Sequence, residues 1–158
     1  ARREFAGASL TDPGTGALEE SGSGVGVGRN INVPLPPGSG NAALIAVADT
    51  IVAPAAAMFR PDLILVSAGF DPHYLDQTFA MDDTGFATLT ARLCAVAEEY
   101  AGGRLVVVLE GGYNAEALAA SSRAVVRALA GRPGDMVNVL KEDPGLPAVV
   151  AARMFHGF

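Results

Sequence analysis

The sequence predicts an α/β domain built on parallel strands. Two short apolar segments, 61–71 and 104–109, contain β-branched residues and lead into small residues and a carboxylate, as buried parallel strands do. A helical pattern over 84–100 lies between them, with apolar residues three and four positions apart. A strand, a helix and a second strand in this order form the connection that joins neighbouring parallel strands.

Composition favours one acidic domain with a core. The chain has 158 residues, of which 50% are apolar. Its 11 basic and 17 acidic residues give a net charge of -6, which argues against binding to nucleic acid or to an anionic membrane. Pro54, Arg60 and Pro61 interrupt the most hydrophobic region, so we expect no membrane span. Cys94 has no partner for an internal disulfide, so we expect an inert thiol and a cytoplasmic location.

The amino-terminal region predicts a loop. Ala1 stands in place of an initiator methionine, and residues 1–10 have no signal-peptide profile, so we expect a fragment of a longer protein. Residues 11–28 are rich in glycine, serine and other small residues. The glycines of 22–28 have the composition of a phosphate-binding loop, but no buried strand precedes them. The residues that follow, 29–34, predict a short strand and no helix, so a nucleotide site is the weaker hypothesis.

Two helices flank the first predicted strand. The earlier one, over 41–59, should be capped by Asn41 and kinked or split by Pro54. The later one should be capped by Asp83 or Thr84 and ended by a glycine pair. These helices would cover the sheet.

The ends of the two strands carry the candidate site residues. Because parallel neighbours end at the same edge of a sheet, Asp71 and Tyr113 should face one crevice. Gly111 and Gly112 would let a ligand approach the backbone closely. Pro72 restricts Asp71 to an extended conformation, which would hold the carboxylate in a fixed direction.

Structural alternatives stay open for this pair. Asp71 precedes a proline, and this dipeptide commonly opens a turn. Tyr113 could instead pack on the following helix, which Asn114 should cap.

Four motifs together resemble the carboxyl-terminal half of the histone deacetylase family. In chain order they are Pro13-Gly-Thr-Gly16, Asn32-Val-Pro34, Ser67-Ala-Gly-Phe-Asp71 with His73, and Leu109-Glu-Gly-Gly-Tyr-Asn114. The resemblance is closest to the class II and bacterial acetylpolyamine amidohydrolase branch. We therefore expect residues 1–131 to be the carboxyl-terminal part of a deacetylase domain, and residues 132–158 to be a tail with a last packing helix.

The resemblance implies a fold and a chemistry. The fold is an arginase/deacetylase-like α/β fold, a three-layer parallel sheet with flanking helices, which this chain would contain incompletely. The chemistry is that of a zinc-dependent amidohydrolase acting on acetylated amines. In the family, the aspartate at the position of Asp71 is a zinc ligand, and the tyrosine at the position of Tyr113 donates a hydrogen bond to the carbonyl oxygen under attack. Gly111 and Gly112 would bring the backbone close to the substrate channel.

Parts of the family's site are missing from the sequence. Its other zinc ligands come from an Asp-x-His motif and its general base from a pair of histidines, whereas this chain has only His73 and His156. Asp71-Pro-His73 matches the Asp-x-His pattern but belongs to a different motif of the family. We therefore expect a structural or rim role for His73. We expect His156 to be solvated near the terminus. Leu75-Asp76-Gln77 replaces the usual Gly-Asp-Pro.

Two functions therefore stay open. The first is a fragment of a zinc-dependent deacetylase whose complete chain hydrolyses N-acetyl amides, such as acetyl-lysine or acetylpolyamine, and which is inactive alone. The second is a noncatalytic α/β module, a remnant or pseudoenzyme used for binding or assembly. The expected partner is an acetylated amine, with neither nucleic acid nor membrane. The fragment alone would expose a sheet edge and an apolar face, so we expect self-association or poor folding.

Overall fold

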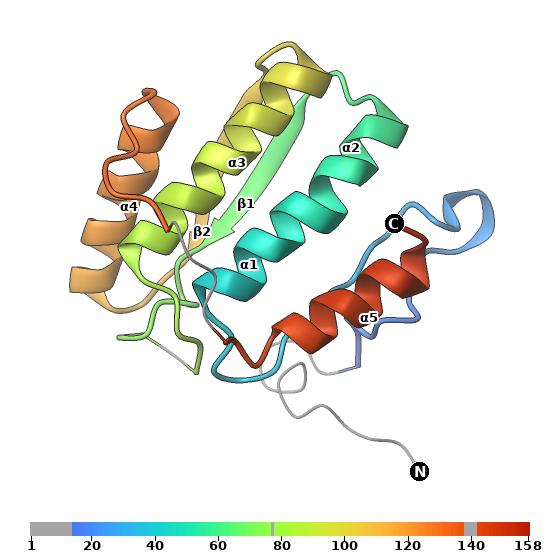
Figure 1. The fold of residues 1–158 in the computed structure, drawn as a ribbon, viewed down its shortest axis with the longest axis horizontal. Coiled ribbons are helices and arrows are strands. Elements are labelled where there is room, and N and C mark those ends of the chain that lie inside the picture. The colour runs from blue at the N-terminus through green and yellow to red at the C-terminus, as the bar shows by residue number, and fades with distance from the viewer. Residues whose placement is uncertain (1–13, 77, 138–141) are drawn as a thin grey trace.

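Helices packed on a two-stranded parallel sheet make up the fold (Figure 1). A computed structural model describes residues 14–76, 78–137 and 142–158. The expectations for the first ten residues, and Pro13 of the first motif, lie outside these ranges. In chain order the elements are η1 (Gly24–Gly26), α1 (Asn41–Val47), the π-helical η2 (Ala48–Val52), α2 (Ala53–Phe59), β1 (Ile64–Gly69), α3 (Asp83–Ala101), β2 (Leu105–Gly111), α4 (Ala115–Leu129) and α5 (Leu146–His156).

β1 and β2 are parallel neighbours, as the sequence predicts. Ile64 pairs with Leu105, and an irregularity near the strand ends places Gly69 opposite Gly111. α3 joins the two strands and lies over the sheet, with α4 on one side and the α1–α2 run on the other (Figure 1). The strand ends that carry the candidate site therefore lie at one edge.

Only one face of this sheet is covered by described helices (Figure 1). On that face Ala68 and Val107 pack against a buried cluster of Phe70, Met81, Phe86 and Val125. On the other face, Leu65 is 68% exposed, Val106 46% and Val108 50%. The strands are therefore half-exposed in this chain instead of buried, and the uncovered apolar face expected of a fragment is present.

The helix predicted over 41–59 is one continuous run through α1, η2 and α2. Pro54 does not split it. The π-helical turn just before Pro54 widens the helix where the missing amide hydrogen and the ring would disturb regular α-helical bonding. The prediction that Asn41 caps this helix is wrong, because Gly40 occupies the cap position. The Asp143 carboxylate instead accepts hydrogen bonds from the amides of Gly40 and Ala43, both at 3.0 Å.

By length and composition this 19-residue helix, Asn41–Phe59, could cross a membrane, although the sequence analysis expected no span. One such helix is a weak indication, since a core helix of a globular protein passes the same test. Here α1 and η2 pack against α5 around a cluster of Ala43, Ile51, Val149 and Ala152.

α3 and α4 begin at side-chain caps. Asp82, one residue earlier than predicted, accepts from the amide of Gly85 and caps α3. Gly102 ends that helix in the left-handed conformation, with φ 58°, as predicted. Asn114 caps α4 as predicted, because its side-chain oxygen accepts from the amides of Glu116 and Ala117.

The segment 29–34 is irregular, so the strand predicted there is wrong. The side-chain amides of Asn30 and Asn32 donate to the backbone carbonyls of Glu20 and Ala17, respectively. These bonds fold the segment back onto the preceding loop and take the place of a strand partner. The glycines of 22–28 are followed by this irregular segment, so the helix that a phosphate-binding loop requires does not follow them.

α5 is the helix predicted near the end of the chain. The prediction that His156 is solvated is wrong. Its ring lies 5.0 Å from that of Phe155 and 6.5 Å from that of Phe158, and its Nε2 atom is buried.

Candidate functional site

The carboxylate of Asp71 lies against the end of β2. A side-chain carbon built on Gly111 would stand 2.5 Å from Asp71 Oδ1, and one built on Gly69 would stand 2.8 Å from it. The Phe70 amide donates to the Gly111 carbonyl at 2.9 Å, so the backbone that follows β1 is still hydrogen-bonded to the end of β2. Asp71 and the turn before Tyr113 therefore share one edge of the sheet.

Tyr113 follows a turn that needs glycine. Gly112 has φ 123°, and a side-chain carbon there would stand 2.9 Å from Phe70 Cβ and 3.2 Å from Leu118 Cδ1. Tyr113 itself is 78% exposed, so it does not pack closely on α4. Packing thus explains why glycine stands at both Gly111 and Gly112. Their place in a substrate channel stays a prediction.

Asp76 is a polar residue of this edge that the sequence analysis did not select. Its Oδ2 atom accepts from the amides of Tyr113 and Asn114, at 2.5 and 2.7 Å. The Asn114 side chain in turn donates to the Leu75 carbonyl at 3.0 Å. The sequence signals were a carboxylate in the loop after β1 and the aspartate that Leu75-Asp76-Gln77 shares with the usual Gly-Asp-Pro. Neither signal named the hydrogen-bond partners, which are 37 and 38 residues away.

His73 has the structural role that the sequence analysis expected. It is 3% exposed, and its Nδ1 atom accepts from the Leu75 amide at 3.2 Å. Its ring stacks on Tyr74, with centroids 4.6 Å apart, and lies parallel to Phe86 at 6.4 Å. Packing and this hydrogen bond account for a buried histidine.

This chain alone does not fit a complete zinc site. Within the described ranges, no group of three or more histidine, cysteine, aspartate or glutamate side chains is placed to hold a metal ion. A structural or catalytic zinc site needs at least three protein ligands. Asp71 can supply one carboxylate, and the sequence contains no second family ligand motif.

Cys94 is not activated as a nucleophile. It lies in α3, and burial together with the Glu98 carboxylate raises the pKa of its thiol. The raised pKa disfavours the reactive thiolate form of this half-buried residue.

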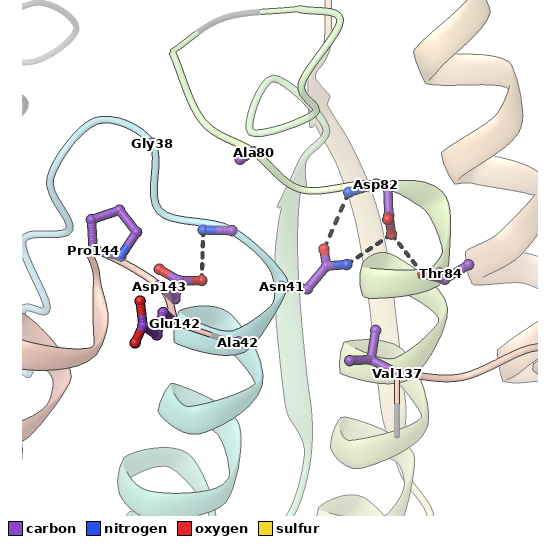
Figure 2. Close-up of a pocket in the computed structure, with 11 residues that line it drawn as sticks. Gly38, Asn41, Ala42, Ala80, Asp82, Thr84, Val137, Glu142, Asp143 and Pro144 are labelled. Carbon is purple, nitrogen blue, oxygen red and sulfur yellow. Dashed lines mark hydrogen bonds between the residues drawn. The ribbon is translucent and has the colours of Figure 1, made fainter. Parts of the chain in front are cut away.

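A pocket of about 390 Å³ lies away from these residues, beside the amino-terminal ends of α1 and α3 (Figure 2). Its polar groups hold elements together. Asn41 and Asp82 hydrogen-bond to each other, at 2.9 and 3.2 Å, and Asp143 binds the start of α1. Thr84 Oγ1 also donates to Asp82 at 2.7 Å. These side chains already have partners within the protein.

A parallel sheet with a carboxylate and a glycine-tyrosine turn at one edge is typical of α/β proteins that bind ligands at the carboxyl ends of their strands. A profile of the histone deacetylase domain matches residues 10–129. The chain belongs to the histone deacetylase family.

Individual relatives agree with this assignment. The chain is 48% identical over 139 residues to "Histone deacetylase 10, chloroplastic" of Oryza sativa subsp. japonica, covering 84% of this chain and 31% of that protein. It is 42% identical over 121 residues to "Histone deacetylase-like amidohydrolase" of Pseudomonas aeruginosa, covering 75% of this chain and 32% of that protein. The solved structure of the histone deacetylase Clr3 superposes with a TM-score of 0.85 at 28% identity, covering 96% of this chain and 26% of that one.

These matches confirm the resemblance and the arginase/deacetylase-like fold. The chain spans 31% and 32% of the two relatives' length, so it contains part of that fold.

Proposed function

We propose that this chain is the carboxyl-terminal part of a zinc-dependent deacetylase that hydrolyses N-acetyl amides such as acetyl-lysine or acetylpolyamine. One observation supports this most directly. In a chain of the histone deacetylase family, the Asp71 carboxylate and the Gly111–Gly112 turn that leads to Tyr113 lie at the same edge of a parallel sheet. Ligands of open α/β sheets bind at this edge.

In this proposal, Asp71 and Tyr113 have different roles. Asp71 is a zinc ligand, and its carboxylate oxygen is an ordinary donor for that metal. When bound, zinc supplies a Lewis acid that polarises the acetyl carbonyl and acidifies water. The exposed phenol of Tyr113 donates a hydrogen bond to the carbonyl oxygen as negative charge develops on it. Gly111 and Gly112 bring the backbone close to the substrate.

The remaining ligands and the base belong, in this proposal, to another part of the complete protein. We expect the 158-residue chain to be inactive alone, since it has neither the Asp-x-His motif nor a histidine pair. The net charge of -6 favours a cationic acetylated amine over an anionic substrate. A cytoplasmic location stays a prediction.

The missing histidines favour a second candidate, a noncatalytic binding or assembly module. The reading frame upstream of Ala1 discriminates the two. An Asp-x-His motif and a histidine pair encoded there support the enzyme. A natural start at this point would support the noncatalytic module.

The zinc content and the turnover of an acetyl-lysine peptide test the enzyme proposal in the complete protein. We expect Asp71→Ala to lose both zinc and turnover. We expect Tyr113→Phe to keep its zinc and to lower kcat by about 10²–10³-fold, because one hydrogen-bond donor to the developing oxyanion is lost. Tyr74→Phe is the matched control, since Tyr74 is also exposed, at 58%, and should change neither quantity.

Either of two results would contradict these roles. One is full zinc occupancy in Asp71→Ala. The other is wild-type kcat in Tyr113→Phe.

A further inference from the structure

The loop after β1 returns to the turn that carries Tyr113. Asp76 Oδ2 accepts from the Tyr113 amide at 2.5 Å and from the Asn114 amide at 2.7 Å. The Leu75 carbonyl accepts from the Asn114 side chain at 3.0 Å. Three hydrogen bonds thus connect this loop to two of the three residues between β2 and α4, Tyr113 and Asn114.

A carboxylate suits this place for two reasons. Hydrogen bonds from amides to an ionised carboxylate are stronger than those to a neutral acceptor. Asn114 is also the cap of α4, so the carboxylate lies at the amino-terminal end of a helix, where the backbone carries partial positive charge. Asp76 therefore binds the turn more firmly than a neutral side chain would.

The turn needs such an anchor because glycines precede it. Gly111 and Gly112 give the backbone before Tyr113 a wide conformational range, and Gly112 adopts a φ of 123°. Most of the Tyr113 side chain is exposed, so packing does little to fix it. The hydrogen bonds from these two amides to Asp76 therefore hold the backbone from which the Tyr113 side chain extends.

We infer that Asp76 is a positioning residue for Tyr113. Its carboxylate holds the two amides so that the phenol can donate to the carbonyl oxygen of the substrate, and it does not touch the substrate itself. This role rests on the proposed function of Tyr113. A shift of about 1 Å in a catalytic group can lower a rate by about 10²-fold, so a modest movement of the turn would be measurable.

A double-mutant cycle in the complete protein tests the inference with an acetyl-lysine peptide as substrate. We expect Asp76→Ala to lower kcat by about 10²-fold and to change KM by less than about 3-fold. In a Tyr113→Phe background the same change should lower kcat by less than about 2-fold, because the phenol that Asp76 positions is already absent. Asp76→Asn keeps an acceptor oxygen without the charge, so it should recover about 10-fold of the lost kcat.

A second measurement does not depend on turnover. Amide hydrogen exchange in the peptide that covers 111–117 should become faster in Asp76→Ala. Asp62→Ala is the control, since Asp62 is an exposed carboxylate before the start of β1 and should change neither exchange nor kcat. Zinc content and circular dichroism check that each variant is folded. Asp76→Asn serves in place of Asp76→Ala if the latter does not fold.

The outcomes separate this inference from the proposed function. A wild-type protein with zinc but without turnover overturns the proposed function, and the role of Asp76 with it. If the wild type is active, any one of three results overturns the role of Asp76 alone. These results are unchanged kcat in Asp76→Ala, an equal loss of kcat in the Tyr113→Phe background, and unchanged exchange over 111–117.

Discussion

The carboxylate of Asp71 owes its position to two glycines. Side-chain carbons at Gly69 and Gly111 would stand 2.8 and 2.5 Å from its Oδ1 atom, closer than a carbon and an oxygen can approach without displacing one of them. The side chain therefore occupies space that any other residue at these positions would fill. Single residues at the strand ends thus decide where the Asp71 carboxylate can lie.

Gly111→Ala should redirect this carboxylate. We expect the complete protein to lose most of its zinc, because the new methyl group displaces Asp71 Oδ1 from its place at the sheet edge. Gly111 does not have a positive φ, so alanine fits its backbone and the melting temperature of the metal-free protein should change little. Zinc content and thermal unfolding measure the two effects. Gly26→Ala is a control, since no atom lies within 4 Å of a side-chain carbon built on Gly26 and its φ is not positive. Wild-type zinc in Gly111→Ala would contradict the prediction.

At the scale of elements, Asn41 and Asp82 join the amino-terminal ends of α1 and α3. The Asn41 side chain donates to Asp82 Oδ1 and accepts from the Asp82 amide, at 2.9 and 3.2 Å. A side-chain carbon on Gly85 would stand 1.9 Å from the Asn41 oxygen, which explains a glycine in the first turn of a helix. One pair of polar side chains therefore both caps a helix and fixes its neighbour.

The Asp82 carboxylate should make folding dependent on pH. Burial raises its pKa, but hydrogen bonds from Thr84, Gly85 and Asn41 outweigh burial and hold the pKa below the ordinary value of 3.8. Because the folded pKa is the lower one, the ionised carboxylate stabilises the folded state above pH 3.8, and this contribution is lost as the pH falls through the folded pKa.

Asp82→Ala should lower the free energy of unfolding by about 1–2 kcal/mol near neutral pH, as the loss of a helix cap does. The difference from wild type should shrink below pH 3.8. Urea unfolding of the complete protein over this range measures it. Asp83→Ala is the matched control, since Asp83 is the exposed neighbouring carboxylate and should show a smaller difference. An equal difference at all pH values would show that the charge is not involved.

At the scale of the whole molecule, the uncovered face of the sheet dominates the behaviour of this chain. Leu65, Val106 and Val108 lie side by side on β1 and β2 and are about half exposed or more, at 68, 46 and 50%. Among residues 14–76, 78–137 and 142–158, the two-stranded sheet also has outer strand edges without partners. Exposed apolar surface of this kind favours association with other chains.

The 158-residue chain alone should therefore self-associate. Light scattering coupled to size exclusion should give a mass above the 16.1 kDa of one chain. Val106→Lys should lower the measured mass, because it places a charge in the middle of the apolar face. Val126→Lys is the control, since Val126 is 63% exposed on α4 and lies away from that face. A monodisperse, cooperatively melting monomer would contradict the prediction.

Local patterns determined much of this protein from the sequence alone. Apolar periodicity and β-branched segments predicted β1, α3 and β2, and the helical crossover between the strands predicted that they are parallel. Parallel pairing placed Asp71 and Tyr113 at one edge, and the motifs there identified the family that the comparisons confirm. Asn114 was predicted as a cap because capping depends on residues within one turn.

Only the tertiary structure decided the contacts between distant segments. Asp76 binds the amide of Tyr113, Asn41 binds Asp82, and Asp143 binds the amide of Gly40 across 103 residues. No local propensity encodes such pairs, because they depend on the path of whole loops and on how the helices pack. For the same reason, the sequence placed Asp71 at the edge of the sheet, while the fold supplied the glycine-lined space that its carboxylate occupies.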